Sequence, residues 1–377
     1  MAKLKEVCTF FADGDWIESS DQSDEGIRLI QTGNIGEGKY LEKETRAKYI
    51  SESTFNKLSC TEVYPGDILV SRLPEPVGRA CIIPEKNERM ITAVDCTICR
   101  PNETLISKEY MCYFMRSNVY HTRLLGSVTG TTRKRISRKN LGNVEVKIPP
   151  KGEQNAIVKQ LDCLTSVISL RSRELELLDE LVRGRFVEMF GDPVSNPYGY
   201  DKVTLSDLAD IKIGPFGSLL HKEDYIDGGH PLLNPSHIVD GKVSPDDKLT
   251  ISDEKYEELS AYQLKTGDVV MGRRGEMGRC AVVPEDGFLC GTGSMFIRTK
   301  GEVTADYIQK IISFPSFKKT IEDMAVGQTM PNLNVPIVSG FQIIKPPMEV
   351  QDRYYAFAEQ VNKSKVILPK SSFNVII

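Results

Sequence analysis

Hydrophobic residues follow two patterns along the chain. Short apolar, β-branched runs bounded by Gly, Pro or Asn, such as residues 67–71, 79–83 and 143–148, are typical of β-strands. Residues 153–190 instead space their apolar side chains by alternating steps of four and three, which predicts one long helix with a heptad seam. At 1.5 Å per residue this helix is roughly 57 Å long. We expect Gly191-Asp192-Pro193 to end it.

The chain also repeats itself about 200 residues apart, a period that indicates duplicated domains. Residues 65–72, PGDILVSR, return as residues 266–273, TGDVVMGR; residues 78–85, GRACIIPE, return as residues 278–285, GRCAVVPE. Two further blocks keep the same order: Gly130-Thr131-Thr132 matches Gly327-Gln328-Thr329, and Pro149-Pro150 with Gln154 matches Pro346-Pro347 with Gln351. The chain is therefore interpreted as a tandem duplication with diverged halves.

A second, shorter helical pattern follows the second Pro-Pro pair. It continues the step of four and three from Val350, and Pro369 ends it after about 20 residues, or roughly 30 Å. The expected fold is α+β, with β-rich domains at 1–150 and 192–347, a central helix at 151–191 and a shortened distal helix at 348–377. The seam residues that we expect at helix interfaces are Ile157, Leu161, Leu164, Ile168, Leu175, Leu178, Val182, Val350, Tyr354, Phe357 and Val361.

Composition narrows the class of protein. A chain of 377 residues with 40% hydrophobic and 27% charged residues is globular and large enough for two domains. No apolar run approaches the roughly 20 residues of a membrane-spanning helix, and the first residues lack the apolar stretch of a secretory signal. Nine scattered cysteines fit a reducing compartment, so we expect a cytoplasmic protein without a membrane segment.

Charge is distributed unevenly. The formal net charge of −4 excludes a uniformly basic nucleic-acid coat, but residues 110–144 hold seven Arg or Lys and no Asp or Glu. This segment is interpreted as a face that contacts phosphates, although a solvated surface would look similar. In the second half, Gly272-Arg273-Arg274-Gly275 places two guanidiniums on a turn after a strand. They suit guanine or phosphate, and a purely structural turn remains the alternative.

Motifs that would indicate catalysis are incomplete. Residues 33–40 have the glycine and lysine spacing of a phosphate-binding loop, but Tyr40 stands where a Ser or Thr hydroxyl is needed. Cys96 and Cys99 lie in a strand-like run that would point them to opposite faces, which disfavours a zinc site. Asn196-Pro197-Tyr198 lacks one proline of the pocket with which adenine methyltransferases hold a flipped base. We therefore expect no catalytic residues and no metal site.

The repeated motifs resemble those of the specificity (S) subunits of type I restriction-modification enzymes. The likeness rests on the GDILVSR-type strand with its following Gly-Arg, the Pro-Pro-x-x-x-Gln step into a long helix, and Phe190-Gly191-Asp192-Pro193 after that helix. It implies two target-recognition domains on a pseudo-twofold axis and two antiparallel helices as spacer. It also implies as partners double-stranded DNA, adenine methyltransferase (M) subunits that bind S-adenosylmethionine, and restriction/translocase (R) subunits that use ATP and Mg. No cofactor is expected in this chain.

Under this interpretation each half binds one half of a split, asymmetric DNA target, because the halves differ most between their shared blocks. A helical scaffold and a stand-alone DNA-modifying enzyme are the alternatives; the first leaves the acid-free segment unexplained, and the second needs carboxylates or a cofactor loop that we do not find. The expected DNA-binding residues are Arg72, Arg79, Thr131, Thr132, Arg133, Lys134, Arg135, Arg273, Arg274, Gln328, Thr329, Asn332 and Asn334.

The unequal helices carry one further expectation. An antiparallel distal helix of about 20 residues reaches back only to about residue 170 of the central helix. The seam residues from Ile157 to Ile168 would then be bare and available to the modification subunits, with self-association through the spacer helices left open.

Overall fold

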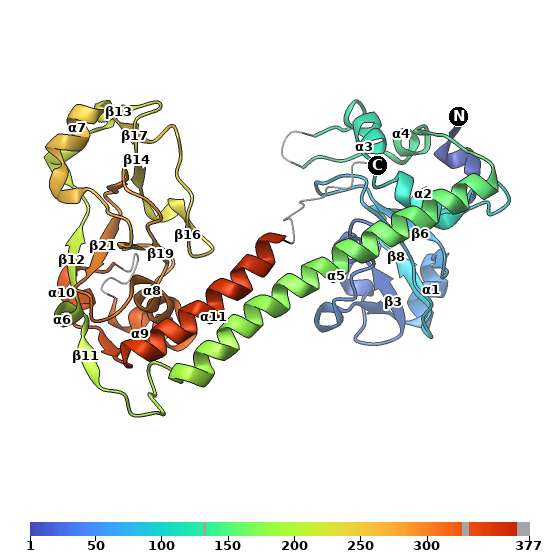
Figure 1. Cartoon of the computed structure of the whole chain (residues 1–377). Helices are drawn as coiled ribbons and strands as arrows, with labels where there is room; N and C mark the ends of the chain where they lie inside the picture. The colour runs from blue at the N-terminus through green and yellow to red at the C-terminus, as the bar shows by residue number, and fades with distance from the viewer. Residues whose placement is uncertain (131–132, 326–331, 368–377) are drawn as a thin grey trace. The chain divides into compact units, whose positions relative to one another are not determined.

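The structure is a computed structural model that describes residues 1–130, 133–325 and 332–367. It contains two compact units, the first built on Met1–Arg173 and the second on the described residues from Glu174 onward. Each unit is α+β, and each holds two four-stranded sheets. The expected fold of two β-rich halves with long helices is therefore confirmed (Figure 1).

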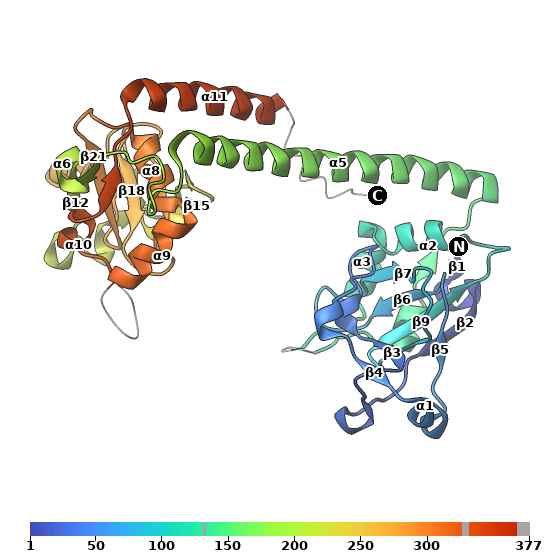
Figure 2. The ribbon, with the colours of Figure 1, turned by 90° about the horizontal axis from the view of Figure 1, so that it is seen from below.

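In the first unit the central sheet is antiparallel throughout. Its strands lie in the order β2 (Cys8–Asp13), β9 (Cys96–Pro101), β6 (Ile68–Ser71) and β7 (Ala80–Ile82). The second sheet has the order β4 (Tyr49–Ile50), β3 (Ile27–Ile30), β8 (Met90–Thr92) and β5 (Glu62–Val63), and β3 runs parallel to β8. A small ladder joins β1 (Ala2–Lys3) to β10 (Glu145–Val146). The helices are α1 (Glu52–Leu58), α2 (Lys108–Phe114), α3 (Asn118–Leu125) and α4 (Arg138–Gly142), and Figure 2 labels α1, α2 and α3.

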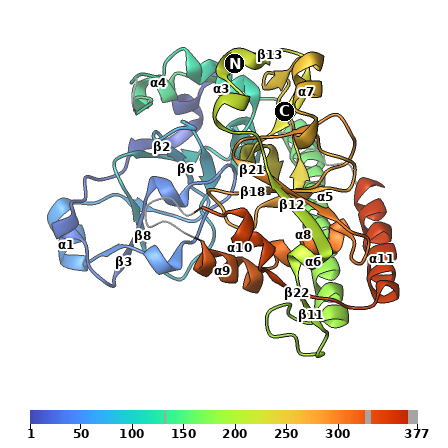
Figure 3. The ribbon, with the colours of Figure 1, turned by 90° about the vertical axis from the view of Figure 1, so that its left-hand side faces the viewer.

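The second unit repeats the strand order of the central sheet, whereas its second sheet has a different order. Its central sheet is β12 (Ala209–Ile213), β21 (Ser294–Thr299), β18 (Val269–Gly272) and β19 (Cys280–Val282). Its second sheet is β13 (Tyr225–Ile226), β17 (Thr250–Ile251), β14 (His230–Leu233) and β20 (Leu289–Cys290). The ladder β11 (Lys202–Thr204) with β22 (Gln342–Ile344) and the hairpin β15 (Ile238–Val239) with β16 (Lys242–Val243) complete it. The helices are α6 (Leu205–Leu208), α7 (Asp253–Glu258), α8 (Ala305–Ser313), α9 (Pro315–Met324) and α10 (Val335–Ser339), and Figure 3 views this unit from another side.

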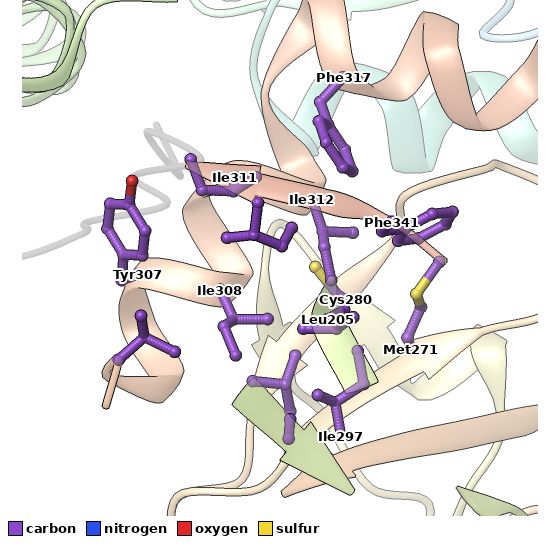
Figure 4. Packing of buried hydrophobic residues seen from close by; sticks show 14 of the residues in the cluster. Leu205, Met271, Cys280, Ile297, Tyr307, Ile308, Ile311, Ile312, Phe317 and Phe341 are labelled. Atoms are coloured by element: carbon purple, nitrogen blue, oxygen red, sulfur yellow. The ribbon is translucent and has the colours of Figure 1, made fainter. Parts of the chain in front are cut away.

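The core of the second unit lies between the central sheet and α8. Ile308, Ile311 and Ile312 of α8 are fully buried in one cluster with Met271 of β18 and Ile297 of β21 (Figure 4). Each such side chain stabilises the fold by about 1.5–3 kcal/mol relative to exposure. The steps of three and four that place these isoleucines on one face of α8 therefore hold the helix on the sheet.

The repeated Gly-Asp motif is structural. Asp67, just before β6, forms two hydrogen bonds with the Arg100 guanidinium at 2.7 and 2.8 Å. Asp268, just before β18, does the same with Arg298 at 2.8 and 2.6 Å. Both carboxylates are 2% exposed. Since a buried carboxylate needs such a partner, the motif is preserved in both halves by the interior of the sheet.

The buried glutamine that follows each Pro-Pro pair is also structural. Gln154 accepts a hydrogen bond from the Ser107 backbone N–H at 2.9 Å and donates to the carbonyls of Leu105 and Pro149, both at 2.9 Å. In the second half, Gln351 accepts from the Thr304 N–H at 3.2 Å. Each glutamine thus fixes the first turn of a long helix to its own domain.

The two long helices are α5 (Lys151–Phe190) and α11 (Met348–Ile367). Gly191 follows α5 with φ of 73°, as expected for a glycine terminator. The Tyr354 ring of α11 lies 5.4 Å from the rings of both Phe186 and Phe190, and Lys365 lies 2.5 Å from Asp179. Because a later residue of α11 meets an earlier residue of α5, the helices are antiparallel in this stretch (Figure 1).

The expectation of a bare stripe on the first part of α5 is wrong for most of its members. Ile157, Leu161 and Ile168 are half-buried, and only Leu164 is exposed. The first unit itself approaches the helix here, because the Tyr113 hydroxyl of α2 donates to the Asp162 carboxylate at 2.6 Å. Within the described residues, no helix has both the length and the apolar character to cross a membrane.

Candidate nucleic-acid interface

Chain segments that are distant in sequence meet at one end of the β2-β9-β6-β7 sheet. Beyond the end of β2, the Gly14 N–H donates to the Cys96 carbonyl at 2.9 Å. Beyond the end of β6, the Arg72 carbonyl accepts from the Ile136 N–H at 3.1 Å. The acid-free segment therefore lies against the same strand end as the first arginine turn, and we call this region the strand-end face.

Arg72 is buried beneath the strand-end face. The residue is 5% exposed. Its Nε lies 3.2 Å from an Asp13 carboxylate oxygen, and its terminal nitrogens donate to the carbonyls of Ile136 at 3.3 Å and Val94 at 2.6 Å. The Arg72 side chain is therefore directed to protein acceptors and not to solvent, which disfavours the expected DNA contact.

Arg79 is also committed to the protein. Its half-buried guanidinium donates to the backbone carbonyls of Ile35 at 3.1 Å, Pro74 at 3.3 Å and Pro76 at 3.1 Å. It therefore closes the turn between β6 and β7. These hydrogen bonds give Arg79 a structural role in the turn, and its expected DNA contact stays a prediction.

The basic segment provides the exposed charges of the first half. Arg133, Lys134 and Arg135 are all exposed. Thr129 and Arg135 exchange two backbone hydrogen bonds of 2.9 Å, so the segment turns back on itself. The Lys134 ammonium lies 2.9 Å from Glu75, an exposed pair that contributes little to stability. The expected residues Thr131 and Thr132 lie outside the described residues.

The second half builds the same face with different side chains. The Arg273 carbonyl accepts from the Leu333 N–H at 3.0 Å, and the Arg273 Nε donates to the Leu333 carbonyl at 3.0 Å. Arg273 is half-buried, and burial together with the neighbouring Arg274 charge lowers the pKa of its guanidinium. Arg274 is exposed. Of these two arginines, Arg274 is therefore the one exposed to solvent.

Amide side chains complete the second face. Asn332 forms an isolated backbone bridge with Arg274 and is half-buried. Asn334 caps α10, since its Oδ1 accepts from the Ile337 N–H at 2.9 Å, and its oxygen is thereby engaged. The expected residues Gln328 and Thr329 lie outside the described part of the chain.

This face also holds two exposed aromatic residues that the sequence analysis did not predict. Trp16 is 70% exposed and Phe216 is 64% exposed. Strand register makes them equivalent, because Asp13 pairs with Thr97 on β9 as Ile213 pairs with Met295 on β21. Trp16 lies three positions after Asp13, and Phe216 lies three positions after Ile213. Apart from a glycine two positions before each aromatic residue, the surrounding residues differ, so the pairing of the strands is needed to reveal this equivalence.

A glycine fixes the backbone before each aromatic residue. A Cβ at Gly14 would lie 2.2 Å from the Thr92 carbonyl oxygen, and a Cβ at Gly214 would lie 2.1 Å from the Gly291 carbonyl oxygen. Any side chain there would force the strands apart. The close approach therefore holds Trp16 and Phe216 at matching points of their strand ends.

The aromatic residues differ in their electrostatic surroundings. The Trp16 Nε1 donates to Glu18 at 3.4 Å, and the neighbouring Asp15 accepts from the Thr61 N–H at 2.7 Å. Burial raises the pKa of Asp15. Phe216 instead lies between Pro215 and Gly217. Acidic neighbours disfavour phosphate contact, so the Trp16 site suits a base more than the sugar-phosphate backbone.

The chemistry of the strand-end face is that of binding. It presents cationic side chains, an amide and aromatic rings, the groups that contact phosphates and bases. Across residues 1–130, 133–325 and 332–367, no three His, Cys, Asp or Glu side chains are grouped so that they could hold a metal ion.

Comparisons with known proteins agree with a binding role. The family model of the type I restriction modification DNA specificity domain matches residues 1–180 and 197–375. The EcoKI specificity subunit of Escherichia coli K12 is 20% identical over 371 residues, which cover 90% of this chain and 78% of that protein. The MjaIX specificity subunit of Methanocaldococcus jannaschii is 22% identical, with 91% and 82% covered. The MjaVIII specificity subunit of the same organism is 20% identical over 60% of this chain, which spans 57% of that protein.

Solved structures share the fold. A chain from a study of complex assembly and conformational transition in the type I R-M system superposes with a TM-score of 0.61 at 18% identity, covering 97% of this chain and 90% of that one. The type I restriction-modification S subunit from M. genitalium superposes with a TM-score of 0.53 at 12% identity, covering 97% and 93%. At these identities the likeness concerns the fold alone.

Proposed function

The chain belongs to the type I restriction modification DNA specificity family, and from that premise we propose that each half recognises one half of a split, asymmetric DNA target. A DNA specificity subunit is a non-catalytic subunit of the type I system. The observation that supports the finer proposal is the strand-end face. One scaffold occurs twice in the chain and carries different exposed side chains each time, so two different half-sites are expected.

Different contacts are proposed for the two faces. In the first half, Arg133, Lys134 and Arg135 are exposed on a turned segment and suit phosphates, which attract cations on any sequence. In the second half, the exposed Arg274 is bridged to Asn332, and both side-chain types form paired hydrogen bonds with base edges. The trio in the first half should therefore determine affinity, and the second pair should determine sequence preference.

The partners belong to the same proposal. We expect adenine methyltransferase subunits, which bind S-adenosylmethionine, and restriction subunits, which use ATP and Mg, to supply all of the chemistry. We assign DNA binding to the two β-rich domains predicted from the sequence, at residues 1–150 and 192–347. The helices at 151–191 and 348–377 space these domains and offer surfaces for assembly.

The first test identifies the DNA target and then exchanges one DNA-binding domain of the chain. Chain and modification subunit are produced together, and sequencing of N6-methyladenine in the cellular DNA gives the methylated motif. Replacing residues 192–347 with the corresponding domain of a relative should change one side of that motif and leave the other side intact. A motif that changes on both sides, or on neither, would contradict the assignment of one half-site to each domain.

A second measurement separates phosphate contacts from base contacts. Arg133→Ala should lower the slope of log binding constant against log salt by about one unit, without changing the preferred sequence. Arg274→Ala should weaken binding to the cognate half-site by about 1–3 kcal/mol and relax one position. Equal effects of both variants on all sequences would contradict the base-contact assignment of Arg274.

A further inference from the structure

We propose that Arg72 and Arg273 are positioning residues, each fastening the DNA-binding segment of its own half to the strand end without touching DNA. The inference rests on the proposed function, because it assigns a role within the same recognition faces. We define the recognition segments by their described residues as 129–130 with 133–138 in the first half and 332–334 in the second.

In the first half the fastening is a closed ring of hydrogen bonds. The Arg72 carbonyl accepts from the Ile136 N–H at 3.1 Å, and the Arg72 side chain returns a hydrogen bond to the Ile136 carbonyl at 3.3 Å. The same guanidinium donates to the Val94 carbonyl at 2.6 Å. One side chain therefore joins the recognition segment, the end of β6 and the turn before β9.

In the second half the same ring is built by Arg273. Its carbonyl accepts from the Leu333 N–H and its Nε donates to the Leu333 carbonyl, both at 3.0 Å. Its own N–H donates to the Gly293 carbonyl at 3.0 Å, in the turn before β21. The exposed side chains named above differ between the two faces. Both faces nevertheless attach their recognition segment through the same pair of arginine hydrogen bonds.

The equivalence extends beyond the arginines. Ser137 directly follows Ile136, and its Oγ accepts from the Asn140 N–H at 3.2 Å at the start of α4. Asn334 directly follows Leu333, and its Oδ1 accepts from the Ile337 N–H at 2.9 Å at the start of α10. Each segment is therefore fixed at one point by the arginine and at the next residue by a helix cap.

Arginine suits this role for a geometric reason. Its planar guanidinium carries five donors in a fixed fork, so one side chain can hold carbonyls from separate segments in a set geometry. The exposed residues Arg133, Lys134 and Arg135 lie within three positions of the fastened Ile136. Groups that bind a ligand specifically must be held to about 0.5 Å, so loosening Ile136 should disturb them.

The two rings differ in one partner. Arg72 lies 3.2 Å from Asp13, whereas strand register places Ile213 at the equivalent position in the second half. Arg72 is 5% exposed and Arg273 is half-buried, in accord with a carboxylate that is present in the first half alone. The first ring should therefore tolerate substitution less well than the second.

The experiment uses the complex of this chain with its modification subunit and the methylated target found above. Arg72→Lys and Arg273→Lys keep the charge and lose the fork. Binding is measured against duplexes that carry single base changes in either half-site. Arg72→Lys should reduce discrimination at the first half-site by about tenfold or more and leave the second unchanged, and Arg273→Lys should do the reverse. The salt slope should stay at the wild-type value in both.

Matched controls come from the opposite end of the same central sheets. Arg100→Lys and Arg298→Lys weaken the buried pairs with Asp67 and Asp268, so they perturb each domain without touching a recognition segment. They should lower thermal stability and preserve discrimination. If they relax discrimination as much as Arg72→Lys and Arg273→Lys do, the arginines have only a structural role and the inference is overturned.

Two further outcomes are decisive. Arg72→Gln should leave the salt slope unchanged, and a slope lowered by about one unit would show that Arg72 contacts phosphate, which overturns its positioning role. If Arg72→Lys does not fold, Asp13→Asn replaces it, and unchanged discrimination by that variant would likewise overturn the inference. If the wild-type complex binds all duplexes equally, without any sequence preference, that result would instead contradict the proposed function.

Discussion

The two halves of this chain share an interior and differ at one face. In both interiors a carboxylate that is 2% exposed holds an arginine of the neighbouring strand, Asp67 with Arg100 and Asp268 with Arg298. At the strand ends, the equivalent positions hold Asp13 and Ile213, and Trp16 and Phe216. The difference teaches that the scaffold and the recognition surface are separable, so that one can diverge while the other is retained.

The separation has a physical basis. A buried ion pair leaves an uncompensated charge if one partner is lost, so the interior tolerates little change. Exposed side chains at a strand end carry no such constraint, and most substitutions there alter stability by less than about 0.5 kcal/mol. The recognition face can therefore acquire new contacts while the fold remains stable.

The largest expected effect tests the shared interior. Asp67→Ala and Asp268→Ala should each destabilise their own half by about 3 kcal/mol, at the lower end for buried pairs because the arginines are about one-third exposed. Urea unfolding of the whole chain should show an earlier transition for one half in each variant. Asp67→Asn and Asp268→Asn serve as isosteric controls with smaller losses. A large loss in one half and none in the other would show that the interiors are not equivalent.

The sequence was sufficient for the architecture because the interior is what repeats. The blocks around Asp67 and Asp268, and the glutamines at 154 and 351, match in type and order because each fills the same buried site. The heptad spacing of residues 153–190 likewise predicted one long helix, and α5 spans Lys151–Phe190. A pattern of buried positions is visible in a sequence because burial restricts residue type.

The face was less accessible to sequence analysis, since exposure depends on the tertiary fold. Arg72 and Arg274 look alike in the sequence, yet the first is buried beside Asp13 and the second is exposed. Trp16 and Phe216 were missed because their neighbours share only a single glycine, and strand pairing is needed to align them. The stripe on α5 was expected to be bare because the spacing of its residues does not show that Tyr113 approaches the helix.

The exposed aromatic residues provide the second test of the comparison. Trp16→Ala and Phe216→Ala should each weaken binding at their own half-site by about 1–3 kcal/mol, the range for stacking of a base on an aromatic ring. Trp16 is the only tryptophan of the chain, so its fluorescence should be quenched when duplex DNA is added to the chain alone. Tyr198→Ala, which removes an aromatic residue that is 55% exposed on the turn after α5, should leave binding unchanged.

These variants have a clear contrary outcome. Binding measured by the anisotropy of labelled DNA, without any change in tryptophan fluorescence and without loss in Trp16→Ala, would remove the first aromatic residue from the interface. Such a result in the first half, with a loss in Phe216→Ala, would sharpen the comparison by showing that only the second half uses its aromatic residue.

The smallest expected effect is a difference in pH dependence. Burial lowers the pKa of His121 in α3 of the first half below its ordinary 6.5, so the folded domain favours the neutral ring. As pH falls through 6.5, the unfolded chain binds a proton that the folded domain excludes, and the stability of the first half decreases. Burial raises the pKa of Asp306 in the second half, which has the opposite sign: its contribution is largest at low pH and is lost as pH rises through the raised value. Lowering the pH from 7.5 to 5.5 should therefore move the unfolding transition of the first half to a lower urea concentration. The substitution His121→Gln should reduce that shift. An equal movement in wild type and in His121→Gln would show that this histidine does not distinguish the halves.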